Sequence, residues 1–155
     1  MRLVLFRHGE AGVAARDFDR CLTDQGVTDV RKVACSVADK LNGATAFVSP
    51  YVRARQTCAE IQRNTDLKAC HELPLITPDD DPLQVIDWLN QQDSESTRLL
   101  VTHQPLVSRL ISLLLDGHET GFYPMATASV TILEADVWAV GLAQLEAVIH
   151  AADLE

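Results

Sequence analysis

The chain has 155 residues, of which 47% are hydrophobic and 23% are charged, proportions typical of a folded globular protein rather than a disordered one. A formal net charge of −9 argues against nucleic acid and anionic membranes as partners, because both would repel an acidic surface. No apolar run approaches the roughly 20 residues that a membrane-spanning helix needs. We therefore expect one domain, residues 1–155, with neither a nucleic-acid nor a membrane partner.

The four cysteines, at positions 21, 35, 58 and 70, are widely spaced. They form neither a C-x-x-C motif nor any other familiar metal-binding pattern. The first residues lead straight into a short apolar run and do not resemble a signal peptide. These features predict a cytoplasmic protein with reduced thiols.

Apolar runs and helical periodicity alternate along the chain. Thr23 is expected to cap the first helix, Pro50 to occupy the first position of the second, and Gly117 to end the last. Strands are predicted at 3–6, 45–48, 67–73 and 98–102, and helices at 24–41, from Pro50 to about 61, from 82 to about 92, and at 106–116. Two further strands, 127–133 and 137–145, are predicted to form an antiparallel hairpin joined by residues 134–136.

This alternation predicts an α/β domain with three layers, α/β/α. The sheet is expected to be mostly parallel, with the final hairpin as its antiparallel edge. In such sheets, ligands bind beyond the carboxyl ends of the strands. The residues that follow each strand are therefore the first candidates for a functional site.

Arg7 and His8 follow the first predicted strand, Arg53 follows the second at a helix start, and His103 follows the strand at 98–102. Arginine binds phosphate through a fixed fork of donors, and a neutral histidine can attack phosphorus or transfer a proton. If the strand ends converge, these four side chains can hold and cleave a phosphoryl group.

Metal binding is the alternative role for the two histidines. It is disfavoured because no carboxylate or cysteine stands beside them at a familiar spacing. Asp79–Asp81 form an acidic cluster, which we interpret as the start of the next helix, where the helix dipole favours negative charge.

Four motifs, in this order and spacing, resemble the histidine phosphatase superfamily, whose fold is that of phosphoglycerate mutase. Over residues 1 to about 133, the chain is similar to its smallest members, the SixA-type phosphohistidine phosphatases. The motifs are Arg7-His8-Gly9, Leu22-Thr23 with Gly26, Ser49-Pro50-x-x-Arg53-x-x-Gln56-Thr57, and Thr102-His103-x-Pro105.

The resemblance implies a two-step hydrolysis without cofactor or metal. His8 would attack phosphorus and form a phosphohistidine intermediate, which water then hydrolyses. The carbonyl of Gly9 would hold the other ring nitrogen of His8, so that the attacking nitrogen stays unprotonated. The remaining phosphate ligands implied by the resemblance are Arg7, Arg53, His103 and the backbone N–H of Gln104.

Larger members of the superfamily use an acidic residue, in a segment inserted between the Arg53 motif and the His103 motif, to protonate the leaving oxygen. Here that segment is short, and no motif distinguishes Glu72 or Asp79–Asp81 as the acid. Phosphohistidine leaves as an imidazole, which needs less help from an acid than an alkoxide does. The expected substrate is therefore a phosphohistidine-bearing protein, such as a phosphotransfer domain, and the product is inorganic phosphate.

Two other functions remain open on the sequence. The first is a small-molecule phosphomonoesterase of the same superfamily. The second is a binding module for phosphorylated ligands that has lost turnover, although such a module would not need to keep His8.

Overall fold

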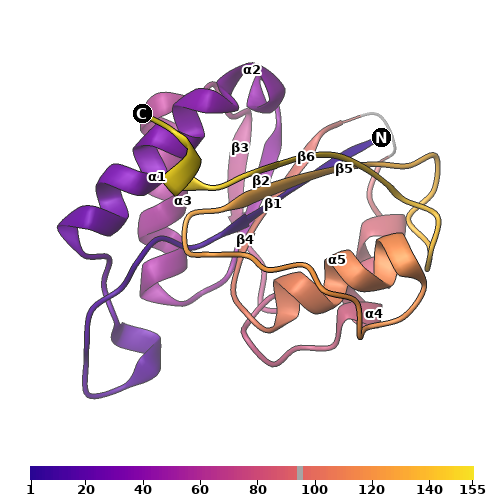
Figure 1. The fold of residues 1–155 in the computed structure, drawn as a ribbon, viewed down its shortest axis with the longest axis horizontal. Helices are drawn as coiled ribbons and strands as arrows, with labels where there is room; N and C mark the ends of the chain where they lie inside the picture. Colours follow the sequence, from indigo (N-terminus) through magenta and orange to yellow (C-terminus); the bar gives the residue numbers. More distant parts are fainter. Residues whose placement is uncertain (94–95) are drawn as a thin grey trace.

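A computed structural model describes residues 1–93 and 96–155. Its centre is a six-stranded sheet in the order β3-β2-β4-β1-β5-β6 (Figure 1). The first four strands of this order are parallel, and β5 and β6 are antiparallel to their neighbours, which confirms the predicted sheet. The strands are β1 (Arg2–Arg7), β2 (Thr45–Val48), β3 (Ala69–Glu72), β4 (Arg98–Thr102), β5 (Val130–Glu134) and β6 (Gln144–Ile149).

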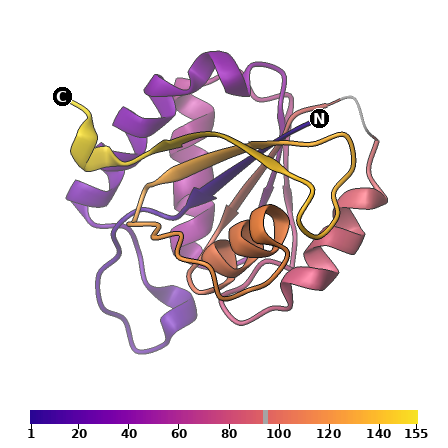
Figure 2. The same ribbon diagram turned by 45° about the vertical axis from the view of Figure 1, so that its right-hand side comes forward.

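Helices cover both faces of the sheet, so the three-layer prediction is confirmed (Figure 2). One face carries α1 (Asp24–Ser36), α2 (Ala38–Leu41) and α3 (Val52–Asn64), together with the short 3-10 turn η2 (Ala151–Asp153). The other face carries α4 (Pro82–Asn90) and α5 (Leu106–Asp116). No helix among the described residues is long and apolar enough to cross a membrane.

Strand β1 lies inside the sheet and contributes to both cores. Val4 and Phe6 point into the core beneath α1 and α3, whereas Leu3 and Leu5 point into the core beneath α4 and α5. All four side chains are fully buried, which explains why this strand is a continuous apolar run rather than an alternating one.

The helix predicted at 24–41 begins as expected, because the Thr23 side chain accepts a hydrogen bond from the N–H of Gly26. It is, however, two helices: the backbone of Val37 leaves helical geometry between α1 and α2. Pro50 does not occupy the first helical position, since α3 begins at Val52 with Tyr51 as its N-cap. Both corrections concern boundaries, which depend on packing as well as on local sequence.

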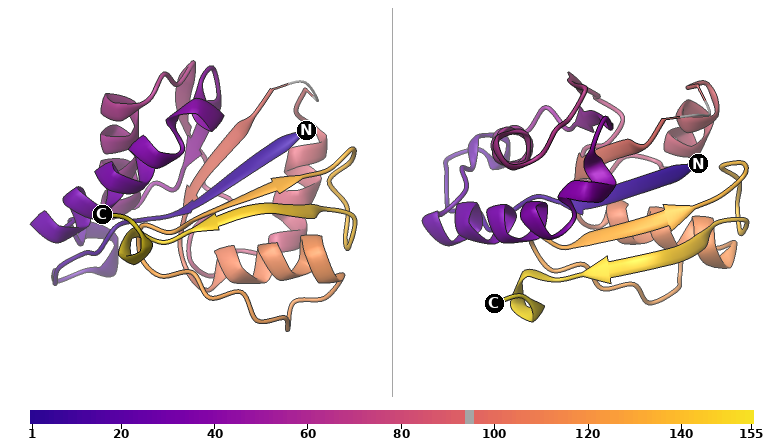
Figure 3. Two further views of the ribbon diagram at one scale, coloured as in Figure 1. Left: turned by 45° about the horizontal axis from the view of Figure 1, so that its top comes forward. Right: turned by 90° about the horizontal axis from the view of Figure 1, so that it is seen from above.

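The second strand of the hairpin was predicted too early, at 137–145. The structure places β6 at Gln144–Ile149, after a long connection from β5 (Figure 3). The buried side chain of Trp138 packs in the core beside α5, and the N–H groups of Gly141 and Ala143 donate to carbonyls of the last turn of α5. Residues 137–143 are thus an irregular connection held on α5 by Trp138, Ala143 and two backbone hydrogen bonds, while Val137, Val140 and Leu142 stay exposed.

The connections from β1 and β4 leave the sheet in opposite directions. These strands are parallel neighbours, but α1, after β1, packs on one face and α5, after β4, packs on the other. In a sheet of this kind, such a reversal opens a crevice at the carboxyl ends of the two strands. The candidate residues Arg7, His8 and His103 follow directly on these two strands.

Candidate active site

The ends of β1 and β4 bring two histidines together. Arg7 pairs in register with Thr102, so the next residues, His8 and His103, emerge beside each other. Their ring centroids are 5.0 Å apart, and His8 is only 5% exposed while His103 is fully buried.

The ring of His8 is held in one orientation by its own backbone segment. Its Nδ1 hydrogen-bonds the carbonyl of Gly9 at 2.8 Å, which places the ring proton on Nδ1 and leaves the lone pair on Nε2. The Nε of Arg53 donates to that Nε2 at 3.2 Å. Burial and the charges of Arg53, Arg7 and Arg20 lower the pKa of His8 to about 4, against the opposing effect of the Gly9 carbonyl. The ring is therefore neutral at pH 7.

Gly9 sits where three segments meet. Its N–H donates to Oγ1 of Thr57 at 3.1 Å, and the same hydroxyl donates to the carbonyl of Arg53 at 2.8 Å. A Cβ at position 9 would lie 2.8 Å from the side chain of Val30 and 2.9 Å from the carbonyl of Gly26. Glycine is needed here because the loop after β1 packs directly on α1.

Arg7 projects toward the same crevice. Its Nη1 donates to the carbonyl of Met125 at 2.7 Å, while its buried Nε has no hydrogen-bond partner among the described residues. Burial, followed by the charge of Arg53, lowers the pKa of Arg7. Two guanidinium groups whose charges repel each other favour a bound anion.

The imidazole ring of His103 is held in place by residues that follow β2. The Nε2 of His103 is 2.7 Å from the hydroxyl of Ser49, and the ring of Tyr51 packs edge-on against the imidazole with centroids 4.8 Å apart. Burial, His8 and the arginines lower the pKa of His103 to about 3. Its buried Nδ1 has no partner within the described part of the chain.

Arg53 lies in the first turn of α3, as predicted, and is buried. The sequence missed what holds it there. Its Nη1 donates to the backbone carbonyl of Asp17 at 2.7 Å, and its Nη2 pairs with the Asp17 carboxylate at 3.2 Å. Asp17 belongs to η1 (Asp17–Asp19), a short 3-10 turn in the connection between β1 and α1.

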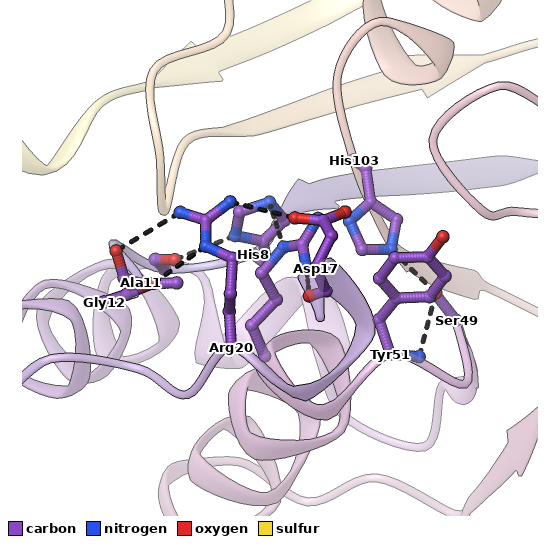
Figure 4. A network of polar contacts seen from close by, with 10 residues as sticks. His8, Ala11, Gly12, Asp17, Arg20, Ser49, Tyr51 and His103 are labelled. Atoms are coloured by element: carbon purple, nitrogen blue, oxygen red, sulfur yellow. Dashed lines mark hydrogen bonds and ion pairs between the residues drawn. The ribbon is translucent and has the colours of Figure 1, made fainter. Parts of the chain in front are cut away.

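Arg20 is the second residue that the sequence missed. It donates to the carbonyls of Ala11 and Gly12 and to the carboxylate of Asp17, which lies between Arg20 and His103 (Figure 4). No strand precedes Arg20, so the rule that located the other site residues could not find it. The only local signal was its position two residues before the Leu22-Thr23 motif.

Gln104 follows His103, but its carboxamide turns away from the two rings. Its Nε2 donates to the hydroxyl of Ser108 at 2.6 Å, and its Oε1 accepts from the N–H of the same residue. Only its backbone N–H, at the approach to α5, remains as a candidate phosphate donor.

Two of the acidic candidates, Asp80 and Asp81, serve local structure. The carboxylate of Asp80 accepts from the N–H and hydroxyl of Thr77, and that of Asp81 caps α4 as predicted. Within residues 1–93 and 96–155, no group of three histidine, cysteine or acidic side chains could hold a metal ion.

The site thus has an unprotonated histidine nitrogen surrounded by two arginines and a second histidine. The sequence model of the histidine phosphatase superfamily (branch 1) matches residues 3–76. A SixA phosphohistidine phosphatase homologue from Haemophilus influenzae is 30% identical over 145 residues, covering 84% of this chain and 87% of the relative. The chain belongs to the histidine phosphatase superfamily.

Solved structures of this superfamily share the whole fold. The protein histidine phosphatase SixA complexed with tungstate matches with a TM-score of 0.88 and 28% identity over all of both chains. A putative SixA from Nakamurella matches with a TM-score of 0.78 and 24% identity over 96% of this chain and 95% of the other. The phosphoglycerate mutase-like fold and the SixA-type resemblance are therefore confirmed, and the protein is a phosphatase, which is a hydrolase.

Proposed function

We propose that this phosphatase hydrolyses phosphohistidine on a partner protein, through a phosphohistidine intermediate on its own His8. The observation that carries the proposal is the state of the His8 ring. Its Nδ1 hydrogen-bonds Gly9, its pKa lies near 4, and its Nε2 therefore carries a lone pair at neutral pH. Such a nitrogen can attack phosphorus in line and leave two easier steps in place of one difficult one.

The groups around Nε2 supply the charge stabilisation that phosphoryl transfer needs. Arg7 and Arg53 would bind the equatorial oxygens, and the N–H of Gln104 would add a donor. The buried Nε of Arg7 and Nδ1 of His103 have no partner among the described residues, and phosphoryl oxygens would satisfy both. If the Ser49 hydroxyl donates to Nε2 of His103, the proton of this neutral ring is on Nδ1 and can be donated to an oxygen.

The substrate class is argued from the lack of an available acid at the site among the residues that the structure describes. The carboxylate that pairs with Arg53 is that of Asp17. Partial burial opposes its ionisation, but hydrogen bonds from Arg20 and Arg53 outweigh this and lower its pKa. An ionised Asp17 cannot protonate an alkoxide, whereas the imidazole of phosphohistidine leaves more readily. The names of the SixA relatives support the same substrate.

We further propose that the partner is a phosphohistidine carrier such as a phosphotransfer domain, that inorganic phosphate is the product, and that no metal or cofactor takes part. We place the protein in the cytoplasm, and this remains a prediction from the sequence.

The test compares a phosphohistidine-bearing phosphotransfer protein with p-nitrophenyl phosphate, both in the presence of a chelator. The variants are His8→Asn and the control His71→Asn, whose exposed ring packs on Phe47 away from the site. We expect metal-free hydrolysis that prefers phosphohistidine, survives in His71→Asn and is abolished in His8→Asn. Rapid acid-free quenching and peptide mapping should locate a phosphoryl group on His8.

Activity on the small ester alone would replace the proposal with a small-molecule phosphomonoesterase. Phosphate binding without turnover of either substrate would indicate a binding module. Full activity of His8→Asn would overturn the mechanism.

A further inference from the structure

Two cysteines that take no part in the proposed reaction contact each other. Cys58 on α3 and Cys70 on β3 have their sulfur atoms 2.7 Å apart. Both belong to the core on the α1 and α3 face of the sheet, where Cys58 is 2% exposed and Cys70 is half-buried. Cys21 and Cys35 are exposed, and their sulfur atoms contact oxygen atoms rather than another sulfur.

We propose that Cys58 and Cys70 are a peroxide-responsive thiol pair that closes to an intramolecular disulfide and fastens α3 to the edge strand β3. A disulfide bond is about 2.0 Å long, so the two sulfur atoms need to approach each other by less than about 1 Å. The proposal is independent of the proposed substrate, because neither cysteine contacts the phosphoryl site.

The chemistry requires hydrogen peroxide as the oxidant. The thiolate of Cys70, the more accessible sulfur, attacks one peroxide oxygen; the O–O bond breaks, and the departing hydroxide takes up a proton to become water. The sulfur of Cys58 then attacks the resulting sulfenic acid, the S–O bond breaks, and a second water leaves. Two thiols and one peroxide thus give one disulfide and two waters, and a dithiol reverses the reaction.

The environment of the pair favours this order of attack. The hydrogen bond from Cys58 lowers the pKa of the Cys70 thiol, although its partial burial opposes the shift. The same hydrogen bond, together with burial, raises the pKa of Cys58. Cys70 is therefore the first thiol to ionise, and Cys58 is already in place to resolve the oxidised sulfur.

A disulfide between Cys58 and Cys70 would stabilise the edge strand β3. Strand β3 has four residues, lies at the edge of the sheet and, among the described residues, pairs with β2 alone. A link between residues 58 and 70 closes a loop in the unfolded chain and so favours the folded state. Because the sulfur atoms already touch, closure leaves Arg53, five residues earlier on α3, where it is.

The experiment uses the Cys21→Ser/Cys35→Ser variant, which keeps only the pair. The reduced protein is treated with stoichiometric hydrogen peroxide, and free thiols are blocked with iodoacetamide before unfolding. We expect that, after peroxide treatment, iodoacetamide alkylates neither cysteine and the mass of the protein falls by about 2 Da. Treatment with a dithiol should restore both thiols. Trypsin separates the two cysteines into peptides 56–63 and 69–98, which should be recovered as one linked species.

The matched control adds Cys70→Ser and should show neither the mass loss nor the linked peptide. The protein with the oxidised pair should also melt at a higher temperature than the reduced protein. Its phosphatase activity should change by less than about twofold, which corresponds to about 0.4 kcal/mol in the barrier. Should serine at these positions prevent folding, the same peptide map is made on the unaltered chain.

Separate oxidation of the two cysteines, a link from either to a second chain, or, in the unaltered chain, a link from either to Cys21 or Cys35 would overturn the proposal. A linked pair that melts no higher than the reduced protein, or that loses activity tenfold, would overturn the fastening of α3 to β3.

Discussion

His8 and His103 lie side by side because the residues before them, Arg7 and Thr102, are paired across two parallel strands. The ring centroids are 5.0 Å apart, and each ring is buried beside arginines. Adding a proton to either ring therefore places positive charge next to positive charge. Burial first, and then these neighbouring charges, keep both imidazoles neutral at physiological pH and so link the stability of the fold to pH.

The free energy of unfolding should fall as the pH is lowered from about 6.5 toward 4. The pKa of His8 is lowered to about 4 and that of His103 to about 3, so the unfolded chain takes up protons in this range while the folded chain does not. Each histidine should contribute a loss of roughly 1.4 kcal/mol per pH unit well below pH 6.5. Urea unfolding at pH 7, 6 and 5 measures the slope.

The control for this slope is His103→Gln, which removes one titrating ring. Its free energy of unfolding should depend less steeply on pH over the same range. A slope equal to that of the unaltered protein would mean that His103 does not contribute.

Arg53→Ala should lower kcat by about 10²- to 10³-fold, or roughly 3 to 4 kcal/mol in the barrier, because it removes donors from the developing charge. Arg55→Ala is the matched control, since Arg55 is exposed on the same helix two residues later. Steady-state kinetics on a phosphohistidine protein should show Arg55→Ala near the unaltered rate. Equal losses in the two variants would argue that α3 has been perturbed as a whole.

Asp17→Asn should tighten the binding of inorganic phosphate or tungstate by about tenfold, equivalent to about 1.4 kcal/mol. The Asp17 carboxylate now engages Arg53 and Arg20, and an incoming anion must compete with it. Asp19→Asn is the control, because Asp19 pairs with Arg16 instead. Isothermal titration calorimetry gives both affinities; weaker phosphate binding in Asp17→Asn would show that Asp17 positions Arg53 for the ligand rather than competing with it.

Gly26→Ala should destabilise the fold by about 1 to 3 kcal/mol and lower phosphatase activity. A Cβ at this position would lie 2.2 Å from the backbone carbonyl of Glu10, so the segment that follows His8 has to move. Gly12→Ala is the control, because its nearest contact would be 3.9 Å away. Thermal unfolding and kcat are compared in parallel, and an active, fully stable Gly26→Ala would contradict this account of the packing.

The order of strands and helices could be predicted because its signals are local. Four buried apolar residues define β1, Thr23 caps α1, and Gly117 ends α5 in the left-handed conformation. The convergence of Arg7, His8, Arg53 and His103 followed from the same information. Parallel strands present their carboxyl ends at one edge of a sheet, so residues just after them gather there.

Other features depended on contacts between distant residues. The segment 137–143 has the composition of a strand, yet it is an irregular connection from which only Trp138 and Ala143 pack into the core beside α5. The helix break at Val37 is likewise not marked by proline or glycine.

The sequence by itself therefore determined the fold class, the element order and the four strand-end residues, because short-range patterning encodes them. Only the tertiary structure brought Asp17 and Arg20 to the crevice and Cys58 against Cys70. These contacts join a loop to a helix and a helix to an edge strand. No periodicity in the sequence records them, because they arise only when the layers pack together.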